Sequence, residues 1–196
     1  MLRREKWGTK RSRHLRIWKC CVWQESVSRV SGMDMMSISM PVAVRRNNLP
    51  GPCGWGGLPI AGSPDVLAHS DGDVLLHALM DALLGCIGAG DIGTFFPDSD
   101  PAFDNANSAV LLDTVLEHVH KANVQITHVD LTVIAQVPKV SPYREAIRRN
   151  IARLLGLDMG AVNVKATTEE GLGFTGERLG IKAVAVVMGL RNNRDA

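Results

Sequence analysis

Cysteine is scarce in this 196-residue chain, and long hydrophobic runs are missing. The four cysteines, Cys20, Cys21, Cys53 and Cys86, form no spaced metal or bridge pattern, which excludes a disulfide framework and favours reduced thiols in a cytosol-like compartment. Gly, Asp or His breaks every apolar stretch well before the roughly 20 residues that a spanning helix needs. We therefore expect no membrane protein, and 45% hydrophobic with 21% charged residues predicts one compact domain.

The formal net charge of +2 divides unevenly along the chain. Residues 1–50 hold 11 Lys and Arg against 3 Asp and Glu, whereas residues 51–196 hold 11 against 17. Residues 1–54 also lack a sustained period of 3.6 or 2, so we expect a poorly ordered or non-native segment there and a domain over residues 55–196. Three interpretations of the basic segment stay open: an organelle-targeting peptide, a nucleic-acid-binding arm, or a tail or displaced reading frame without its own function.

Apolar periodicity after Gly54 predicts helices and strands that together form an α+β fold. Helices on one face of a mainly four-stranded sheet would give a two-layer sandwich. The expected strands are the end of an edge strand at Gly56–Ile60 and strands at 129–134, 163–165 and 181–188. The first expected helix runs from an N-cap at Ser70 to about Leu84 and is stopped by Gly85. A second helix starts at about Ser108, and a third runs from Ser141-Pro142 to Gly156.

Polar residues recur at helical spacing in the first expected helix. Asp73, His77 and Asp81 are four residues apart, so they share one stripe of that helix. Either His77 is a metal ligand whose imidazole is oriented by the nearby carboxylates, or the three side chains simply face water. His69 and Ser70 stand at the expected helix N-terminus, where free N–H groups and the helix dipole favour a phosphate.

Three further polar clusters lie in loops or at strand ends. In residues 90–100, carboxylates on a Gly- and Pro-rich loop either grip hydroxyls or a divalent cation, or merely cap turns. Residues 135–139 follow a strand and offer backbone groups and Lys139 to a base and a phosphate, while residues 165–176 combine hydroxyls, carboxylates and glycines. Together the clusters predict a site for a polyanionic, hydroxyl-bearing ligand with a divalent metal.

These motifs resemble, in order and spacing, the 2-C-methyl-D-erythritol 2,4-cyclodiphosphate synthase family of the non-mevalonate isoprenoid pathway. The resemblance covers about Trp55 to Leu190 without a gap. It is carried by Ala68-His69-Ser70-Asp71-Gly72-Asp73 with His77, Gly90-Asp91-Ile92-Gly93, Phe96-Pro97-Asp98-Ser99-Asp100, Ala135-Gln136-Val137-Pro138-Lys139, and Lys165-Ala166-Thr167-Thr168 through Gly171-Leu172-Gly173-Phe174.

The resemblance implies a lyase that forms a cyclic diphosphate and releases CMP. It implies a cytoplasmic homotrimer with active sites between neighbouring subunits, Zn²⁺ and Mg²⁺ as cofactors, and no nucleic-acid or membrane partner; a plastid location would follow only if residues 1–54 are a transit peptide. The resemblance implies that His77 ligates zinc, that Glu170 contacts Mg²⁺, that His69 and Thr168 stabilise the transition state, and that Ser70 binds phosphate. It implies ribose contact by Asp91, Ile92 and Gly93, and a methylerythritol pocket formed by Phe96, Pro97, Asp98, Ser99 and Asp100. It also implies a cytidine pocket formed by Ala135, Gln136, Val137, Pro138, Lys139, Val140, Ser141 and Thr167, with further substrate contacts from Glu169 and Phe174.

Two positions depart from the family pattern. The Asp-x-His that supplies the two other zinc ligands would fall at Ala43-Val44-Arg45, and it occurs nowhere in the chain. Glu177 stands where the family commonly has an Arg that faces phosphate, although Arg178 follows it. Two functions therefore stay open: the active cyclase, or a trimeric cytidine-nucleotide-binding homologue with impaired catalysis.

Overall fold

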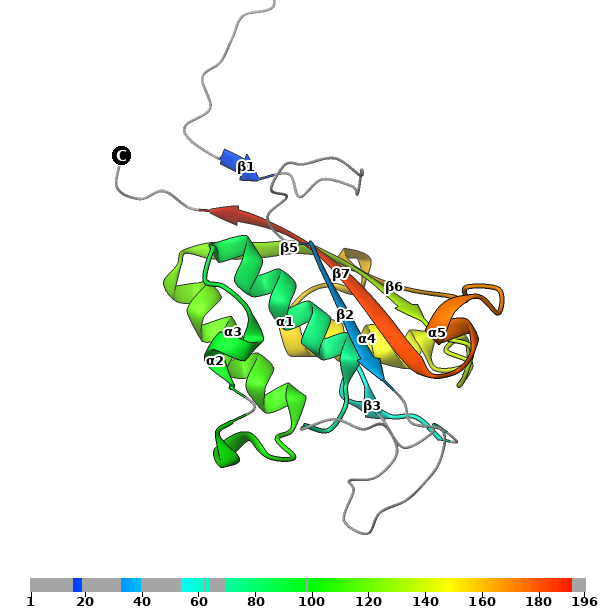
Figure 1. The fold of residues 1–196 in the computed structure, drawn as a ribbon. Helices are drawn as coiled ribbons and strands as arrows, with labels where there is room; N and C mark the ends of the chain where they lie inside the picture. Colours follow the sequence, from blue (N-terminus) through cyan, green and yellow to red (C-terminus); the bar gives the residue numbers. More distant parts are fainter. Residues whose placement is uncertain are drawn as a thin grey trace, which may run out of the picture.

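The computed structural model of the chain describes residues 54–61, 63, 70–97 and 99–191, together with the backbone of residues 16–18 and 33–39 (Figure 1). None of the helices in these ranges has the length and apolarity needed to cross a bilayer. The elements are β1 (Arg16–Trp18), β2 (Met33–Ser39), β3 (Gly54–Trp55), β4 (Leu58–Pro59), α1 (Val74–Ile87), α2 (Ile92–Phe95), the 3₁₀ turn η1 (Pro101–Phe103), α3 (Ser108–Lys121), β5 (Val124–Ile134), α4 (Arg144–Leu155), the 3₁₀ turn η2 (Met159–Ala161), β6 (Val162–Thr167), α5 (Gly173–Gly176) and β7 (Gly180–Arg191).

The main sheet of the described chain has five strands, with β7 and β5 at its centre. β5 pairs with β7 in antiparallel and with β6 in parallel register, while β1 and β2 both pair with β7. The α+β class is confirmed. The sheet has five strands where a mainly four-stranded one was expected, because β1 and β2 pair with different stretches of β7. Gly54–Pro59 forms a separate two-stranded hairpin, β3–β4, instead of the end of an edge strand of the main sheet.

The additional strands lie in the basic segment, where the sequence predicted no element. Met33–Ser39 pairs along seven residues of β7, from Val186 to Gly180. Its sequence, MDMMSIS, has no clean alternation of apolar and polar residues, and an edge strand can pair through its backbone without one. The domain boundary near residue 54 stays a prediction.

The core lies between one face of the sheet and the helices. Alternate residues of β5 (Val129, Leu131, Val133) and of β7 (Ile181, Ala183, Ala185) are fully or almost fully buried, as the period of two predicts. α1 packs on β7 and β2, α3 packs on α1 and β5, and α4 packs on β6. The opposite face of the sheet carries mixed residues such as Asp130, Thr132, Val184 and Val186, which are half-buried. The two-layer arrangement follows from this one-sided burial.

The first helix begins and ends later than predicted. Asp73, not Ser70, is the N-cap of α1, because its side chain accepts a hydrogen bond from the Leu76 N–H. The helix runs through Gly85 and ends at Ile87, and its C-cap Gly88 has the left-handed conformation that glycine adopts at low cost. The predicted start near Ser108 and the predicted end at Gly156 are confirmed. The predicted cap at Ser141 is wrong, since a turn precedes α4.

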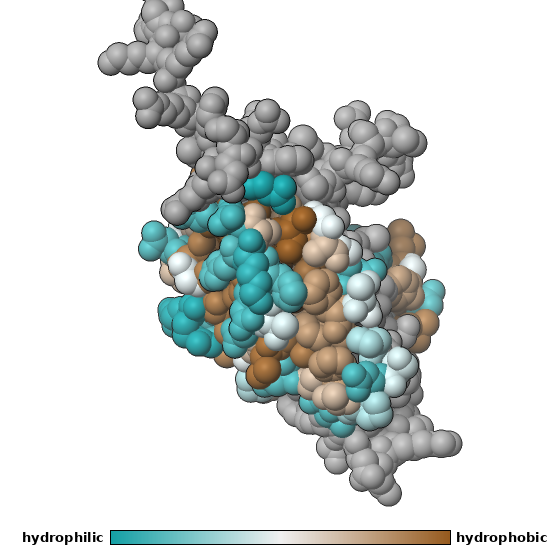
Figure 2. Space-filling model, turned by 90° about the vertical axis from the view of Figure 1, so that its left-hand side faces the viewer, coloured by the Kyte–Doolittle hydropathy of each residue, from teal (hydrophilic) through white to brown (hydrophobic). Residues whose placement is uncertain are grey.

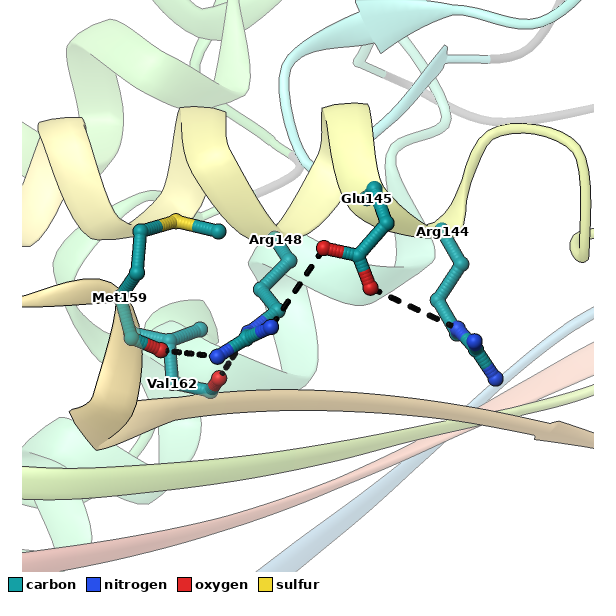
Figure 3. A network of polar contacts seen from close by, with 5 residues as sticks. All are labelled: Arg144, Glu145, Arg148, Met159 and Val162. Carbon is teal, nitrogen blue, oxygen red and sulfur yellow. Dashed lines mark hydrogen bonds and ion pairs between the residues drawn. The ribbon is translucent and has the colours of Figure 1, made fainter.

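One arginine joins α4 to the turn that leads into β6 (Figure 3). The Arg148 guanidinium donates from Nε to the Val162 carbonyl at 2.6 Å and from Nη2 to the Met159 carbonyl at 2.5 Å. Glu145 lies 3.4 Å from Arg148 Nη1 and 3.9 Å from Arg144 Nε. These contacts tie the start of β6 to α4.

Apolar surface remains exposed in a few places. The exposed large hydrophobic residues of the described chain are Val110, Leu172, Phe174 and Leu179, and three of these four lie between β6 and β7. On the side of the molecule shown in Figure 2, hydrophilic side chains lie beside a strip of hydrophobic ones. The surface thus mixes polar areas with apolar areas that another protein surface could cover.

Candidate functional site

His77 lies in the first turn of α1, and its side chain points to two hydroxyl groups. Its Nε2 is 2.9 Å from Ser108 Oγ and 3.2 Å from Ser70 Oγ. Ser70 and His77 are each only 8% exposed, and Ser108 is fully buried. The alternative in which His77 faces water is therefore wrong: packing of α3 against α1 encloses the imidazole.

Asp71 connects the loop before α1 to the start of α3. Ser108 donates to it twice, from the hydroxyl to Oδ1 at 2.5 Å and from the backbone N–H to Oδ2 at 2.9 Å. The Asp73 N–H also donates to Asp71 Oδ1, at 3.2 Å. Asp71 lies in one of the motifs but had no predicted role, and Ser108 carried only the signal of a helix start. The 37 residues between them conceal this contact in the sequence.

The two aspartates that share the sequence stripe with His77 have structural partners. Asp73 is buried and accepts hydrogen bonds from the N–H groups of Gly56, Gly57 and Leu76. Burial raises the pKa of Asp73 to about 7, although these donors oppose the shift. Asp81 accepts from the Ile92 N–H at 2.8 Å and so holds the start of α2 against α1.

The predicted ribose-contacting segment starts at α2. Asp91 is the N-cap of α2, and its carboxylate accepts from the Thr94 hydroxyl and the Thr94 N–H, both at 2.9 Å. The hydrogen bond from the Thr94 hydroxyl, followed by that from the Thr94 N–H, lowers the pKa of Asp91. Asp91 and Gly93 are exposed and Ile92 is half-buried. Asp91 thus caps the turn, as one interpretation expects, and its contact with a ligand stays a prediction.

The loop predicted to contact methylerythritol follows directly. Asp100 caps the turn η1 by accepting from the Ala102 N–H at 2.9 Å. Phe96 packs edge-to-face on Phe103, with ring centroids 5.3 Å apart, whereas Pro97 and Ser99 are exposed. Asp98 lies outside the described residues, as do His69 and residues 43–45, where the family pattern would have Asp-x-His.

A second cluster forms where β5 and β6 end. The two strands run parallel with Ile134 opposite Thr167, and the Ala135 N–H donates to the Thr167 carbonyl at 3.1 Å. Because the carboxyl ends of neighbouring parallel strands meet at one edge, residues 135–141 and 167–170 start side by side. Ala135 and Val140 are buried, Gln136, Val137 and Pro138 are half-buried, and Lys139 and Ser141 are exposed. The structure thus brings together the residues predicted to form the cytidine pocket.

Hydrogen bonds shape the loop that follows β6. Thr168 Oγ1 donates to Glu170 Oε1 at 3.0 Å and accepts the Glu170 N–H at 3.4 Å. Glu170 has a φ of 51°, in the left-handed region that is uncommon for residues other than glycine. Thr168 is half-buried, and the loop presents its hydroxyl and the exposed Glu170 carboxylate together.

Glu169 points to the other side of this loop. Its Oε1 accepts from Lys182 Nζ at 2.6 Å, and its Oε2 accepts from the buried hydroxyl of Thr175. Lys182 Nζ also lies 5.2 Å from the centre of the Phe174 ring, a cation–π distance. The hydrogen bonds from Lys182 and Thr175 lower the pKa of Glu169. Two residues predicted to bind substrate, Glu169 and Phe174, are thus engaged by Lys182, which sequence reasoning missed.

The described residues do not complete a metal centre. No group of three or more His, Cys, Asp or Glu side chains in these ranges could hold a metal ion. A catalytic zinc usually has three protein ligands, and of the implied ligands only His77 lies in the described part of the chain. The described donor set therefore does not fit zinc.

The fold and the two clusters define an α+β domain that gathers imidazole, hydroxyl and carboxylate groups at a helix start and at the carboxyl ends of two parallel strands. The chain belongs to the YgbB family, whose sequence profile matches residues 32–189. The matched range begins within the basic segment, earlier than the residue 55 at which the resemblance began.

Two relatives named as enzymes agree with this membership. A bifunctional enzyme IspD/IspF of Nitratidesulfovibrio vulgaris (strain DP4) is 69% identical over 140 residues, which are 71% of this chain and 35% of the relative. A 2-C-methyl-D-erythritol 2,4-cyclodiphosphate synthase of Trichlorobacter lovleyi is 51% identical over 133 residues, 68% of this chain and 85% of the relative. The chain thus spans about a third of the first relative and most of the second.

A solved structure of IspF from Plasmodium falciparum in complex with CDP has the same fold. It superposes with a TM-score of 0.68 at 36% sequence identity, and the match covers 82% of this chain and 96% of that one. The likeness therefore extends over nearly the whole of the Plasmodium domain.

Proposed function

We propose that this chain converts 4-diphosphocytidyl-2-C-methyl-D-erythritol 2-phosphate to 2-C-methyl-D-erythritol 2,4-cyclodiphosphate and releases CMP. The observation that carries the proposal is the meeting of residues 135–141 and 167–170 at the ends of two parallel strands, in a chain 51% identical to a relative named for this reaction. The CDP complex of the Plasmodium relative supports a cytidine nucleotide as the ligand of this fold.

The proposed reaction needs no nucleophile from the protein. An oxygen of the 2-phosphate attacks the β-phosphorus, the bond from the β-phosphorus to the bridging oxygen breaks, and CMP leaves with that oxygen. The protein's task is to hold the attacking and leaving oxygens in line and to surround the phosphates with donors. We assign these tasks to Ser70 and Thr168, with Ala135–Ser141 holding the base through its backbone and Asp91–Gly93 holding the ribose.

We further propose that the complete site forms between copies of this chain in a homotrimer. Two hydrogen-bonded clusters hold predicted site residues: Ser70, Asp71, His77 and Ser108 between α1 and α3, and Thr168–Lys182 from the end of β6 to the start of β7. Contact between neighbouring chains would join one cluster to the other. The exposed apolar residues of 172–179 and the half-buried outer face of the sheet supply surface for such contact.

Zinc and magnesium remain part of the proposal on the strength of the resemblance alone. His77 would hold zinc and Glu170 would face Mg²⁺, and bound metal would neutralise diphosphate charge. The few cysteines support a cytoplasmic location.

Product analysis tests the activity directly. The purified full chain is incubated with the diphosphocytidyl substrate and divalent metal, and CMP and the cyclic diphosphate are followed by chromatography and ³¹P NMR. Thr168→Ala should lower kcat by on the order of a hundredfold, because a donor to the phosphates is lost. Thr114→Ala, an exposed change on α3, should leave kcat unchanged. Failure of the folded wild type to release any CMP would contradict the proposal.

The second candidate function is cytidine-nucleotide binding without efficient catalysis. It is favoured by the incomplete metal donor set in the described ranges and by Glu177, which is exposed where the family commonly has Arg. Calorimetry with CDP in the presence of a chelator distinguishes the candidates. Binding in the low-to-middle micromolar range, on the order of −6 to −8 kcal/mol, without turnover would favour this candidate. No CDP binding by the folded chain would exclude both.

A further inference from the structure

We propose that Asp71 and Ser108 are positioning residues that fix the tautomer of His77, placing its proton on Nε2 and leaving Nδ1 as the acceptor nitrogen. The tautomer of His77 does not depend on the proposed cyclase activity. The role of that tautomer in an active site rests on the proposed function. A neutral histidine carries one ring proton, and the partner of one nitrogen decides which nitrogen holds it.

The first step concerns the hydroxyl proton of Ser108. A carboxylate can only accept hydrogen bonds, and Asp71 Oδ1 lies 2.5 Å from Ser108 Oγ. The Ser108 N–H occupies the other carboxylate oxygen at 2.9 Å, so both ends of the carboxylate are aligned on Ser108. The single hydroxyl proton of Ser108 therefore points to Asp71.

The second step concerns His77. Since the proton of Ser108 points to Asp71, its oxygen has only lone pairs to offer to His77 Nε2 at 2.9 Å. Two lone pairs facing each other at this distance would repel, so Nε2 must carry a proton. Ser70 Oγ, 3.2 Å from the same nitrogen, can also accept from it. Neutral His77 then has its lone pair on Nδ1.

Burial makes this proton arrangement persistent. Ser108 is fully buried, and the His77 side chain lies between the starts of α1 and α3. Water that could accept the Nε2 proton in place of the hydroxyl has little access there. Asp71 also accepts the Asp73 N–H, which ties the carboxylate to the N-terminus of α1. The position of one proton is thus set by packing between two helices.

Substitution of Asp71 by Ala should release the Ser108 hydroxyl. Without a carboxylate to accept it, the hydroxyl proton can turn to His77 Nε2, so part of the population should carry the ring proton on Nδ1. Asn is not used, because Asp71 Oδ1 also accepts the Asp73 N–H, so either orientation of an amide would set its NH₂ group against a backbone N–H. A role of Asp71 in stability alone would weaken the fold without this shift in tautomer.

The test measures ring-nitrogen shifts by long-range ¹H–¹⁵N correlation on the full chain with labelled histidine, at a pH where His77 is neutral. Comparison with His77→Gln assigns its signals among the six histidines. We expect an Nε2-protonated ring in the wild type and in Ser108→Thr, which keeps a hydroxyl. We expect a mixture of tautomers in Ser108→Ala and in Asp71→Ala.

Two results would overturn the inference: an Nδ1-protonated ring in the wild type, or an unchanged ring in a folded Asp71→Ala variant. If Asp71→Ala does not fold, the contrast of Ser108→Thr with Ser108→Ala decides instead, and equal tautomer populations in that pair overturn the inference. Absence of CMP release with the expected tautomer would contradict only the proposed function. Release of CMP by a chain with the opposite tautomer would contradict only this inference.

Discussion

The carboxylate of Asp73 lies 2.6 Å from the backbone nitrogen of Gly57, sixteen residues earlier in the chain. The same side chain caps α1 and accepts the Gly56 N–H at 3.0 Å, so one buried group joins the helix to the β3–β4 hairpin. Gly56 and Gly57 both have positive φ, and a side chain at Gly57 would approach Asn150 Nδ2 to 2.8 Å. The hairpin thus depends on glycines and on Asp73 together.

Folding stability should depend on pH through Asp73. Burial raises its pKa from 3.8 to about 7, so the folded chain holds this proton more tightly than the unfolded chain does. The stabilisation is fully present below about pH 4 and is lost as pH rises towards about 7, a change on the order of a few kcal/mol. The urea midpoint, plotted against pH across this window, should fall with rising pH more steeply for the wild type than for Asp73→Asn.

An exposed aspartate provides the control for that experiment. Asp113→Asn, on the exposed side of α3, should show the same change of urea midpoint with pH as the wild type. If Asp73→Asn has the same pH dependence as the wild type, then Asp73 is ionised in the folded chain throughout the window.

Arg148 should contribute strongly to stability. Its side chain donates to the carbonyls of Met159 and Val162, and replacing it by Met leaves both acceptors without this charged donor. We expect Arg148→Met to lower the free energy of unfolding by about 2–3 kcal/mol, measured by urea denaturation. Arg149→Met, at an exposed neighbouring position on α4, should change it by less than about 0.5 kcal/mol. Equal effects of the two substitutions would show that the carbonyl contacts contribute little.

Regular periodicity explains which elements could be predicted from sequence. Apolar alternation located β7 and the second half of β5, and a glycine located the end of α4. β5 begins earlier, at Val124, because a register shift between Ile126 and His128 interrupts the alternation. Ser70 and Asp73 are both good N-cap residues, and a contact with Gly56 and Gly57 favours Asp73. No local pattern contains that contact, so the cap was misplaced. The strand at Met33–Ser39 was missed because it is specified by pairing with β7.

The candidate site could be predicted as segments but not as hydrogen-bonded clusters. Parallel pairing of β5 with β6 brings together Ala135 and Thr167, which no spacing rule connects. The burial of His77 depends on α3, which begins 31 residues later. From the sequence, Lys182 is only a polar residue of an expected strand, and the fold places it beside Glu169. Long-range contacts therefore decide which of the predicted residues act together.

Lys182 should keep the loop of Thr168 in its working shape. Its ammonium group binds Glu169 next to Thr168 and lies over the Phe174 ring. If the proposed reaction occurs, Lys182→Met should lower kcat by about tenfold with a smaller change in KM, because the base contacts at Ala135–Ser141 are retained. Lys182→Arg should recover most of the loss, and Lys165→Met, which removes an exposed ion pair with Asp130, should have no effect. Equal kcat in all four proteins would contradict the role of Lys182.

Zinc affinity should be low in this chain and should rise with two substitutions outside the described residues. The described ranges contain no trio of ligands around His77, and the family pattern would have its Asp and His at positions 43 and 45. Ala43→Asp with Arg45→His would raise the number of protein ligands from one to three and remove a positive charge, so affinity should increase by on the order of a hundredfold or more. Competition with a chromophoric chelator measures this for the wild type, the double variant, and the double variant with His77→Ala. We expect the third substitution to cancel the gain. Unchanged affinity in the double variant would mean that positions 43 and 45 lie away from His77, and tight binding that survives His77→Ala would exclude His77 as a ligand.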